Sequence, residues 1–349
     1  MDFFKRHRVG IILLALALLA RVAFLGAGLA AHDGNLTATI YGGDYYYQIS
    51  QNIVAGNGFS AHTEPPYIPN TLRTAGYIYF IAIVLLITKS YWAVIMLQIL
   101  LSACTVLLAR RVSFAIIPNE KIALWCGILM ALNPYVIYLS TIFLTETFFV
   151  FFFLLYMLGF LSYLERPRLS VLCWSALALG VCILTKPTVE YLPILTAGLI
   201  VYRFGFPQLK RSLVHGAIML CIAGAVVAPW IYRNYSEFGA VALSTQPAYN
   251  LYTYFVPSVL SLERGESFNT EFLNFSTPEE RRGDAITFAN SPAYNHKALA
   301  IITQHPKGVL LSIGTTMITF FTTDGLLSVL QQVGLNPSFL LAKPALSLL

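Results

Sequence analysis

Residues 91–111 read YWAVIMLQILLSACTVLLARR, an apolar run that ends in two arginines. A helix that crosses a bilayer needs about 20 residues of this kind. Apolar runs separated by polar stretches recur in both directions from here, at 9–31, 75–88, 121–139, 145–164, 169–185, 189–204, 212–232 and 308–330. The sequence therefore predicts an all-α polytopic membrane protein with about eight transmembrane helices and a juxtamembrane interfacial helix in the first outer loop.

The composition excludes a water-soluble surface. Of the 349 residues, 57% are hydrophobic and 11% are charged, whereas a soluble domain carries about a quarter charged residues. The net charge of +6 does not indicate a nucleic-acid partner, because the basic residues stand beside apolar runs as topology signals do. The five cysteines lie inside apolar runs without CxxC spacing, so we interpret them as small buried hydrophobes: Cys104, Cys126, Cys173, Cys182 and Cys221.

The distribution of basic residues predicts the topology. Only four basic residues (Arg73, Lys89, Lys186 and Arg233) lie in the intervening short stretches, and eleven gather in four clusters: Lys5, Arg6 and Arg8; Arg110, Arg111 and Lys121; Arg166 and Arg168; Arg203, Lys210 and Arg211. All four clusters can face the cytoplasm only if a single crossing separates residue 32 from residue 110. We therefore assign 75–88 to an interfacial or re-entrant helix and 91–109 to the second crossing. If both segments crossed, every later loop would invert.

This topology predicts the domain organisation and the location. We expect a plasma (inner) membrane protein with a cytoplasmic N-terminus, because Lys5, Arg6 and Arg8 precede the first crossing. The run at 9–31 is longer than the h-region of a signal peptide, which favours a retained helix. Residues 1–232 would form a transmembrane catalytic module with an outer loop at 32–90. Residues 233–305 are too long and too charged for a connector, which predicts an extracytoplasmic cap. Residues 306–349 would hold a further transmembrane segment, and the apolar end KPALSLL suggests a truncated or short member of a longer type.

Two carboxylates are candidates for chemistry at the outer face. Asp44 follows two glycines in YGGDYYYQISQNIVAGNGFS (41–60), before an amphipathic helical pattern that Gly56 and Gly58 end. Glu146 starts an apolar helix in STIFLTETFFVFFFLLYMLGF (140–160), at the same predicted level of the membrane. The alternatives are that Asp44 is only an N-cap and that Glu146 only opens its helix in water.

Three cations are predicted at the same outer level. Arg73 precedes the interfacial helix, Lys186 ends the run at 169–185, and Arg233 ends the run at 212–232. Each could be an ordinary snorkelling anchor. Together with the two carboxylates, they predict an anionic ligand held at the membrane surface.

Six motifs in order carry a resemblance to a known class of enzymes. They are GGDYYYQISQNIVAGNGFS, PPYIPNTLRTAGY, LTETFF, ALALGVCILTKPT, APWIYRNYSEFGAVALST and YNLY, and IITQHPKGVL also fits. In this order they resemble the lipid-carrier-dependent glycosyltransferases of the GT-C class. The closest type is the protein mannosyltransferase-like family (glycosyltransferase family 39), which includes the aminoarabinose transferase acting on lipid A. The resemblance runs from the first crossing to about residue 310.

The resemblance implies a GT-C fold and roles for individual residues. An acid in the first outer loop is catalytic in that family, and Asp44 occupies its position. Many members have a second acid directly after it, where this chain has Tyr45, so that role is vacant or has moved to Glu146. Arg73 is the nearest match to a basic residue that contacts the carrier phosphate, although Ala75 stands where members usually have Pro.

We count Lys186, Arg233, Tyr45 and Asn250 of YNLY as further substrate-binding candidates. The partners implied are a polyprenyl-phosphate-linked sugar (hexose or pentose), membrane lipid, and an acceptor that is a glycan, a lipid or a protein. No cofactor is implied with certainty, and a divalent cation stays open.

Elementary chemistry agrees with these roles. A sugar phosphate on a lipid already has a good leaving group, so one carboxylate to take the acceptor proton and cations to hold the phosphate suffice. A single displacement inverts the anomeric centre. Two alternatives remain: a carrier-lipid flippase or transporter, which usually has repeats and broken helices at the midplane, and an inactive lipid-binding relative.

Overall fold

The computed structural model describes residues 2–322 and 325–335, and every regular element in these ranges is helical. This confirms the predicted all-α fold class. The described chain divides into two compact units. Unit 1 holds residues 2–67, 75–230 and 332–334, and unit 2 holds residues 68–74, 231–322, 325–331 and 335.

Unit 1 consists of helices that follow the predicted apolar runs closely. Its helices, in chain order, are α1 (Asp2–Ala31), α2 (Leu36–Ile40), α3 (Tyr46–Ala55), α4 (Ala75–Thr88), α5 (Tyr91–Ile116), α6 (Glu120–Leu132), α7 (Pro134–Leu139), α8 (Glu146–Glu165), α9 (Leu169–Thr185), the 3₁₀ turn η1 (Pro187–Val189), α10 (Leu192–Phe204), the 3₁₀ turn η2 (Phe206–Gln208), and most of α11 (Leu209–Phe238). The predicted bounds 75–88 and 169–185 are those of α4 and α9.

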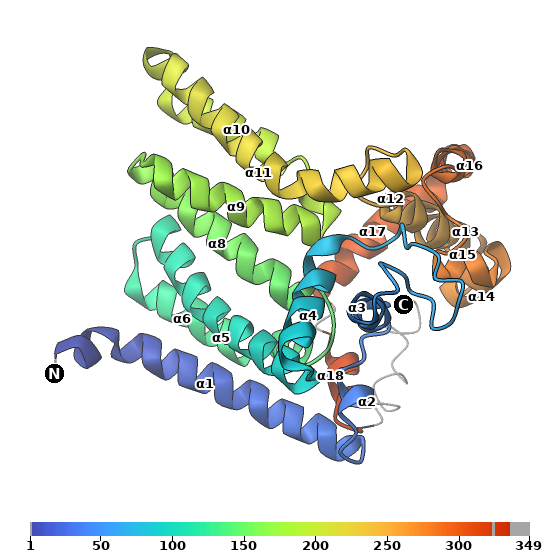
Figure 1. The fold of residues 1–349 in the computed structure, drawn as a ribbon, viewed down its shortest axis with the longest axis horizontal. Coiled ribbons are helices and arrows are strands. Elements are labelled where there is room, and N and C mark those ends of the chain that lie inside the picture. The colour runs from blue at the N-terminus through green and yellow to red at the C-terminus, as the bar shows by residue number, and fades with distance from the viewer. Residues whose placement is uncertain (1, 323–324, 336–349) are drawn as a thin grey trace. The chain divides into compact units, whose positions relative to one another are not determined.

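The centre of unit 1 is α5, which packs against α1, α6 and α8, while α8 packs against α9 (Figure 1). Small residues allow the close approaches. A Cβ atom added at Gly180 of α9 would lie 2.6 Å from the Val226 side chain of α11. Large apolar side chains such as Trp174 and Leu19 are 73% and 69% exposed, as lipid-facing residues would be.

Four described helices are long and apolar enough to cross a membrane: Arg8–Ala31, Tyr91–Ile116, Glu146–Glu165 and Leu209–Phe238. Together with the shorter apolar helices they support an integral membrane protein. The number of crossings, about eight, stays a prediction, because α6, α9, α10 and α17 are shorter than a full span.

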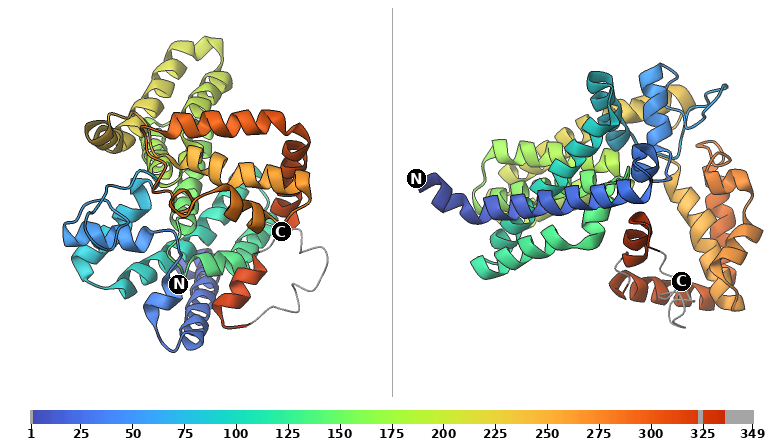
Figure 2. Two further views of the ribbon diagram at one scale, coloured as in Figure 1. Left: turned by 90° about the vertical axis from the view of Figure 1, so that its right-hand side faces the viewer. Right: turned by 90° about the horizontal axis from the view of Figure 1, so that it is seen from below.

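The turns that join α5 to α6, α8 to α9 and α10 to α11 lie at the end of unit 1 where α1 begins (Figures 1 and 2). Three of the four basic clusters fall in or next to these turns, and the fourth (Lys5, Arg6 and Arg8) lies at the start of α1. The opposite ends of the helices carry the start of α8 and the end of α9. The basic clusters are therefore segregated to one end of the helices of unit 1.

The run at 121–139 differs from the prediction, because it forms two helices that break at Asn133. Pro134 lacks an N–H group, so it cannot continue the hydrogen bonding of α6, and the Asn133 side chain accepts from Val136 N at 2.9 Å to start α7. The fully buried Arg21 of α1 donates to the carbonyls of Ala131 (3.1 Å) and Met130 (3.5 Å) at the end of α6. These carbonyls would otherwise lack partners in an apolar interior.

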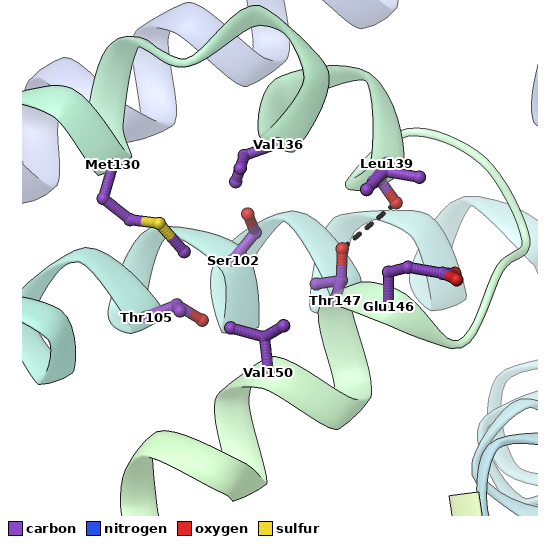
Figure 3. Close-up of a pocket in the computed structure, with 8 residues that line it drawn as sticks. All are labelled: Ser102, Thr105, Met130, Val136, Leu139, Glu146, Thr147 and Val150. Atoms are coloured by element: carbon purple, nitrogen blue, oxygen red, sulfur yellow. Dashed lines mark hydrogen bonds between the residues drawn. The ribbon is translucent and has the colours of Figure 1, made fainter. Parts of the chain in front are cut away.

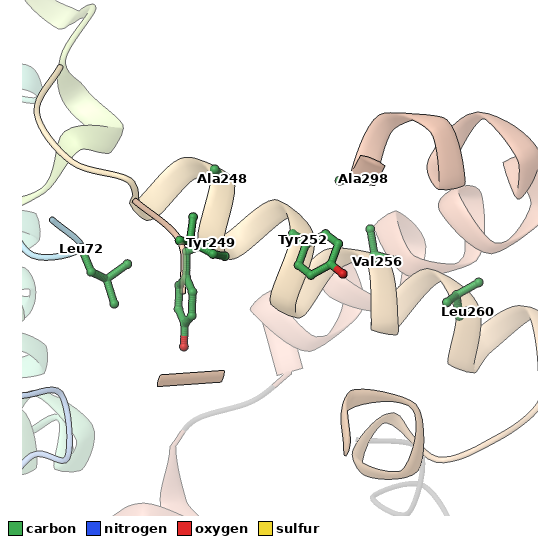
Figure 4. Close-up of a cluster of buried hydrophobic side chains, with 8 residues drawn as sticks. Leu72, Ala248, Tyr249, Tyr252, Val256, Leu260 and Ala298 are labelled. Carbon is green, nitrogen blue, oxygen red and sulfur yellow. The ribbon is translucent and has the colours of Figure 1, made fainter. Parts of the chain in front are cut away.

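Unit 2 is a second helical assembly with its own core. It holds the end of α11, then α12 (Gln246–Tyr249), the π-helical turn η3 (Asn250–Phe255), α13 (Val256–Arg264), α14 (Phe268–Phe275), α15 (Pro278–Arg282), α16 (Ser291–Gln304), α17 (Pro306–Thr322) and most of α18 (Leu326–Gln332). Figure 4 shows buried side chains of α12, η3, α13 and α16 aligned in one cluster, which Leu72 joins: Leu72, Ala248, Tyr249, Tyr252, Val256, Leu260, Ile286 and Ala298.

The packing of α17 on α13 depends on the carboxylate of Glu263, which lies outside the predicted transmembrane segments. Glu263 accepts from Gly308 N at 3.0 Å in the first turn of α17, and its Oε1 lies 3.3 Å from His305 Nδ1. The interaction with His305 lowers the pKa of Glu263, and the Gly308 N–H group and Lys307 act in the same direction. The carboxylate therefore stays charged and holds the start of α17.

Two further expectations meet the structure differently. Of the five cysteines predicted to be buried, Cys182 is fully buried, Cys104, Cys126 and Cys173 are half-buried, and Cys221 is exposed on the surface of α11. The terminal run KPALSLL lies outside the described residues.

Candidate functional site

Asp44 lies in a turn whose backbone is unusual on both sides. Gly43 and Tyr45 both adopt left-handed conformations, with φ of 77° and 66°. Glycine adopts this conformation without strain, whereas tyrosine adopts it at a cost. The N-cap of α3 is Tyr45 and not Asp44, which corrects the expectation that Asp44 occupies the cap position. Tyr45 has no side-chain capping bond.

The segment before Asp44 is fixed to the loop that precedes Glu146. Phe143 N donates to Ile40 O at 2.7 Å. A Cβ atom added at Gly42 would collide with the Phe143 carbonyl oxygen, so this position requires glycine. Gly42 is two positions before Asp44, and Phe143 is three positions before Glu146. The structure thus brings the chain segments of both predicted carboxylates together.

The loop before Glu146 is held in place by the buried side-chain amide of Gln98 in α5. Gln98 is fully buried, and its Nε2 donates to the carbonyls of Leu139 (3.3 Å), Ser140 (3.1 Å) and Ile142 (2.7 Å). Its Oε1 accepts from the Tyr77 hydroxyl of α4 at 2.5 Å. Buried polar groups that are all hydrogen-bonded make a rigid scaffold.

Aromatic rings attach α3 to the same scaffold. The ring of Tyr46 meets that of Tyr77 edge-on, with centroids 5.4 Å apart. The ring of Tyr47 stacks on that of Tyr91 at 4.7 Å and lies 6.3 Å from that of Phe143. The helix that follows Asp44 therefore rests on α4, on the start of α5 and on the loop before Glu146.

Glu146 and Lys186 form an ion pair. Lys186 Nζ lies 2.8 Å from Glu146 Oε1, and the two side chains are 31% and 34% exposed. Lys186 is the C-cap residue of α9, and Glu146 is the first residue of α8. The pair joins two predicted members of the site and neutralises their charges locally.

A small cavity of about 40 Å³ lies beside Glu146, between α5, α6, α7 and α8. Figure 3 shows the Glu146 carboxylate pointing away from Ser102, Thr105 and Met130, which line the other end. Thr147 donates to the Leu139 carbonyl at 3.1 Å in its wall. This volume suits a few water molecules and no lipid chain.

Arg73, Arg233 and Asn250 belong to unit 2. Asn70 joins the two arginines, because its Oδ1 accepts from Arg73 N at 2.9 Å and its carbonyl lies 3.5 Å from Arg233 Nη1. Arg73 is buried, whereas Arg233 pairs with Glu237 at 2.9 Å and lies over the Phe238 ring. Asn250 is exposed at the start of η3, next to Tyr249 in the core cluster.

Gln98 was missed from the sequence, although a signal existed. It is a polar residue inside the apolar run at 91–109, and such residues in membrane helices usually hold a specific partner.

In the described ranges 2–322 and 325–335, no group of three His, Cys, Asp or Glu side chains is placed to hold a metal ion.

Comparison with known proteins gives one family match. Residues 73–232 match the model of the dolichyl-phosphate-mannose-protein mannosyltransferase family. The match confirms the predicted resemblance to GT-C glycosyltransferases. No curated protein and no solved structure matches the chain.

The mannosyltransferase match covers three of the candidate residues, Arg73, Glu146 and Lys186. Asp44 and Tyr45 precede the matched range, and Arg233 and Asn250 follow it. The family supports a membrane glycosyltransferase that depends on a lipid carrier. The roles of all seven residues stay predictions.

Proposed function

We propose that this lipid-carrier-dependent glycosyltransferase inverts the anomeric centre as it moves a sugar from a polyprenyl phosphate to an extracytoplasmic acceptor. The observation that carries the proposal is the turn at Asp44, held by Gly42 against the loop that leads to Glu146. A carboxylate on a rigid turn can be aimed at one oxygen of an acceptor.

The step needs one base and one phosphate site. The acceptor O–H proton passes to the Asp44 carboxylate while the acceptor oxygen bonds to the anomeric carbon. The bond from that carbon to the carrier phosphate oxygen breaks, and the phosphate keeps the electron pair. Arg73 would stabilise the departing phosphate. Lys186 would assist only with the charge that its pairing with Glu146 leaves.

Glu146 has a supporting role in this proposal. Its carboxylate is held in an ion pair with Lys186 at 2.8 Å, which fixes its orientation at the start of α8. We infer that the pair orients the acceptor or the Asp44 turn, and that the base itself is Asp44. The segregation of basic clusters to the opposite end of the unit 1 helices supports an extracytoplasmic site.

The test is the Asp44→Asn variant, with sugar transfer measured in proteoliposomes with a polyprenyl-phosphate sugar. The amide keeps the shape of the side chain but cannot accept the proton. A positioned base typically contributes about 10²- to 10⁴-fold, so the variant should insert and bind donor but lose transfer by that order. The anomeric configuration of the wild-type product, measured by NMR, should be opposite to that of the donor. Near-normal transfer by Asp44→Asn, or a retained configuration, would refute the mechanism.

A further inference from the structure

A basic hollow lies at the end of unit 1 far from Asp44 and Glu146. It is an open surface depression of about 480 Å³, and it is lined by Pro207, Gln208, Lys210, Arg211, Val214 and His215. It is formed where η2 leads into the first two turns of α11. Neither the proposed reaction nor the family match assigns a role to it.

Two of the lining groups are held in place by neighbouring helices. His215 Nδ1 lies 2.7 Å from the hydroxyl of Tyr163, a fully buried residue of α8. When Tyr163 donates to Nδ1, His215 Nε2 carries the hydrogen and is a donor. Arg211 Nη2 donates to the Pro167 carbonyl at 3.3 Å, which leaves its other N–H groups for a ligand.

The charge around the hollow is strongly positive. Arg211 contacts the turn between α8 and α9, which carries Arg166 and Arg168, and Arg203 follows on α10. Glu165 is the nearby acid in sequence, and it is exposed. Among the described residues, no carboxylate pairs with Lys210 or Arg211.

The border of the hollow is apolar. Val214 in its lining is 50% exposed, and Leu213, the residue before it in α11, is 54% exposed. A small soluble anion would leave these apolar side chains exposed, whereas the acyl chains of a lipid would cover them. Basic pockets between membrane helices are a known mode of binding for anionic lipid headgroups.

We propose that this hollow binds the phosphodiester headgroup of an anionic phospholipid. Lys210 and Arg211 hold the phosphate oxygens, His215 closes the floor, and the acyl chains lie along Val214 and Leu213. The bound lipid links the α8–α9 turn to the start of α11. The proposal is independent of the transfer reaction.

The test measures lipid binding to the purified full-length chain in detergent. Native mass spectrometry with phosphatidylglycerol and phosphatidylcholine should show preferential binding of phosphatidylglycerol. Each basic residue at a membrane surface contributes about fivefold to the affinity, so Lys210→Gln with Arg211→Gln should lower it about 30-fold. The matched control, Arg111→Gln with Lys121→Gln, removes two charges from another basic cluster and should change it little.

Two more measurements keep the proposal open to refutation. Lys210→Gln alone leaves the bond from Arg211 to Pro167 intact, and it should still lower phosphatidylglycerol binding about fivefold. Inorganic phosphate at millimolar concentration should not displace the lipid. Equal binding of the two lipids, equal loss in the control variant, or displacement by inorganic phosphate would overturn the proposal.

Discussion

At the residue scale, the position of Asp44 depends on Gly42, the first of the two glycines that precede it. The motif GGD predicts a tight turn, and the structure places left-handed backbone at Gly43 and Tyr45. The sequence cannot tell that Gly42 has a different role, which is to let the chain approach the Phe143 carbonyl. That contact joins segments about a hundred residues apart, and no local pattern encodes it.

Gly42→Ala tests this contact. The added methyl group meets backbone and not a flexible side chain, so one of the two loops must shift. Overpacking of this kind typically costs about 1–3 kcal/mol, and we expect a lower melting temperature and a loss of transfer of more than tenfold.

The matched control is Gly26→Ala in α1, where an added Cβ meets nothing within 4 Å. It should keep both the melting temperature and transfer, since alanine suits a helix at least as well as glycine. Equal behaviour of the two variants would mean that the contact at Gly42 does not position Asp44.

At the element scale, most helix bounds follow from hydrophobic runs, and the differences have physical causes. The run at 121–139 looks continuous in hydropathy, but Pro134 removes an N–H group and Asn133 caps the new helix. The sequence could indicate this break. It could not indicate that Arg21, from a helix more than a hundred residues away, would satisfy the carbonyls left at the end of α6.

Gln98 determines the position of another element, the loop before Glu146. Gln98→Leu fills a similar volume but removes the side-chain donor of the Ser140 carbonyl and the acceptor of the Tyr77 hydroxyl, whereas the Leu139 and Ile142 carbonyls keep other donors. Each unsatisfied buried group costs about 1–3 kcal/mol. We expect kcat for sugar transfer to fall more than tenfold while the donor KM changes little, because the loop carries Glu146 and supports the Asp44 turn.

Thr105→Val is the control for this prediction. Thr105 is buried on the same helix, and among the described residues its hydroxyl bonds only to Leu101 O within α5. Kinetics close to wild type are expected for it. If Gln98→Leu raised the donor KM and left kcat unchanged, the loop would serve donor binding and not the positioning of the carboxylates.

At the scale of the whole molecule, the fold class follows from composition and periodicity, because an apolar chain must hide its backbone polar groups in helices. The arrangement of the candidate site residues follows from the sequence only in part. Glu146 and Lys186 were predicted at one level of the membrane and lie in an ion pair of 2.8 Å, while Arg73 and Arg233 share contacts with Asn70 in the other unit. Such pairings depend on tertiary packing, which charge patterns along the chain do not specify.

Topology is the last property to test, and it rests on the segregated basic clusters. We expect residues 32–90 outside and residues 110–121 inside, because eleven basic residues lie on one predicted side against four on the other. The five native cysteines form no disulfide, so a cysteine-free background should fold. Thr63→Cys and Pro118→Cys place single thiols at exposed positions on either side of α4 and α5. In intact cells, a membrane-impermeant maleimide should label position 63 at once, and it should label position 118 only after permeabilisation. Labelling of position 118 in intact cells would overturn this topology.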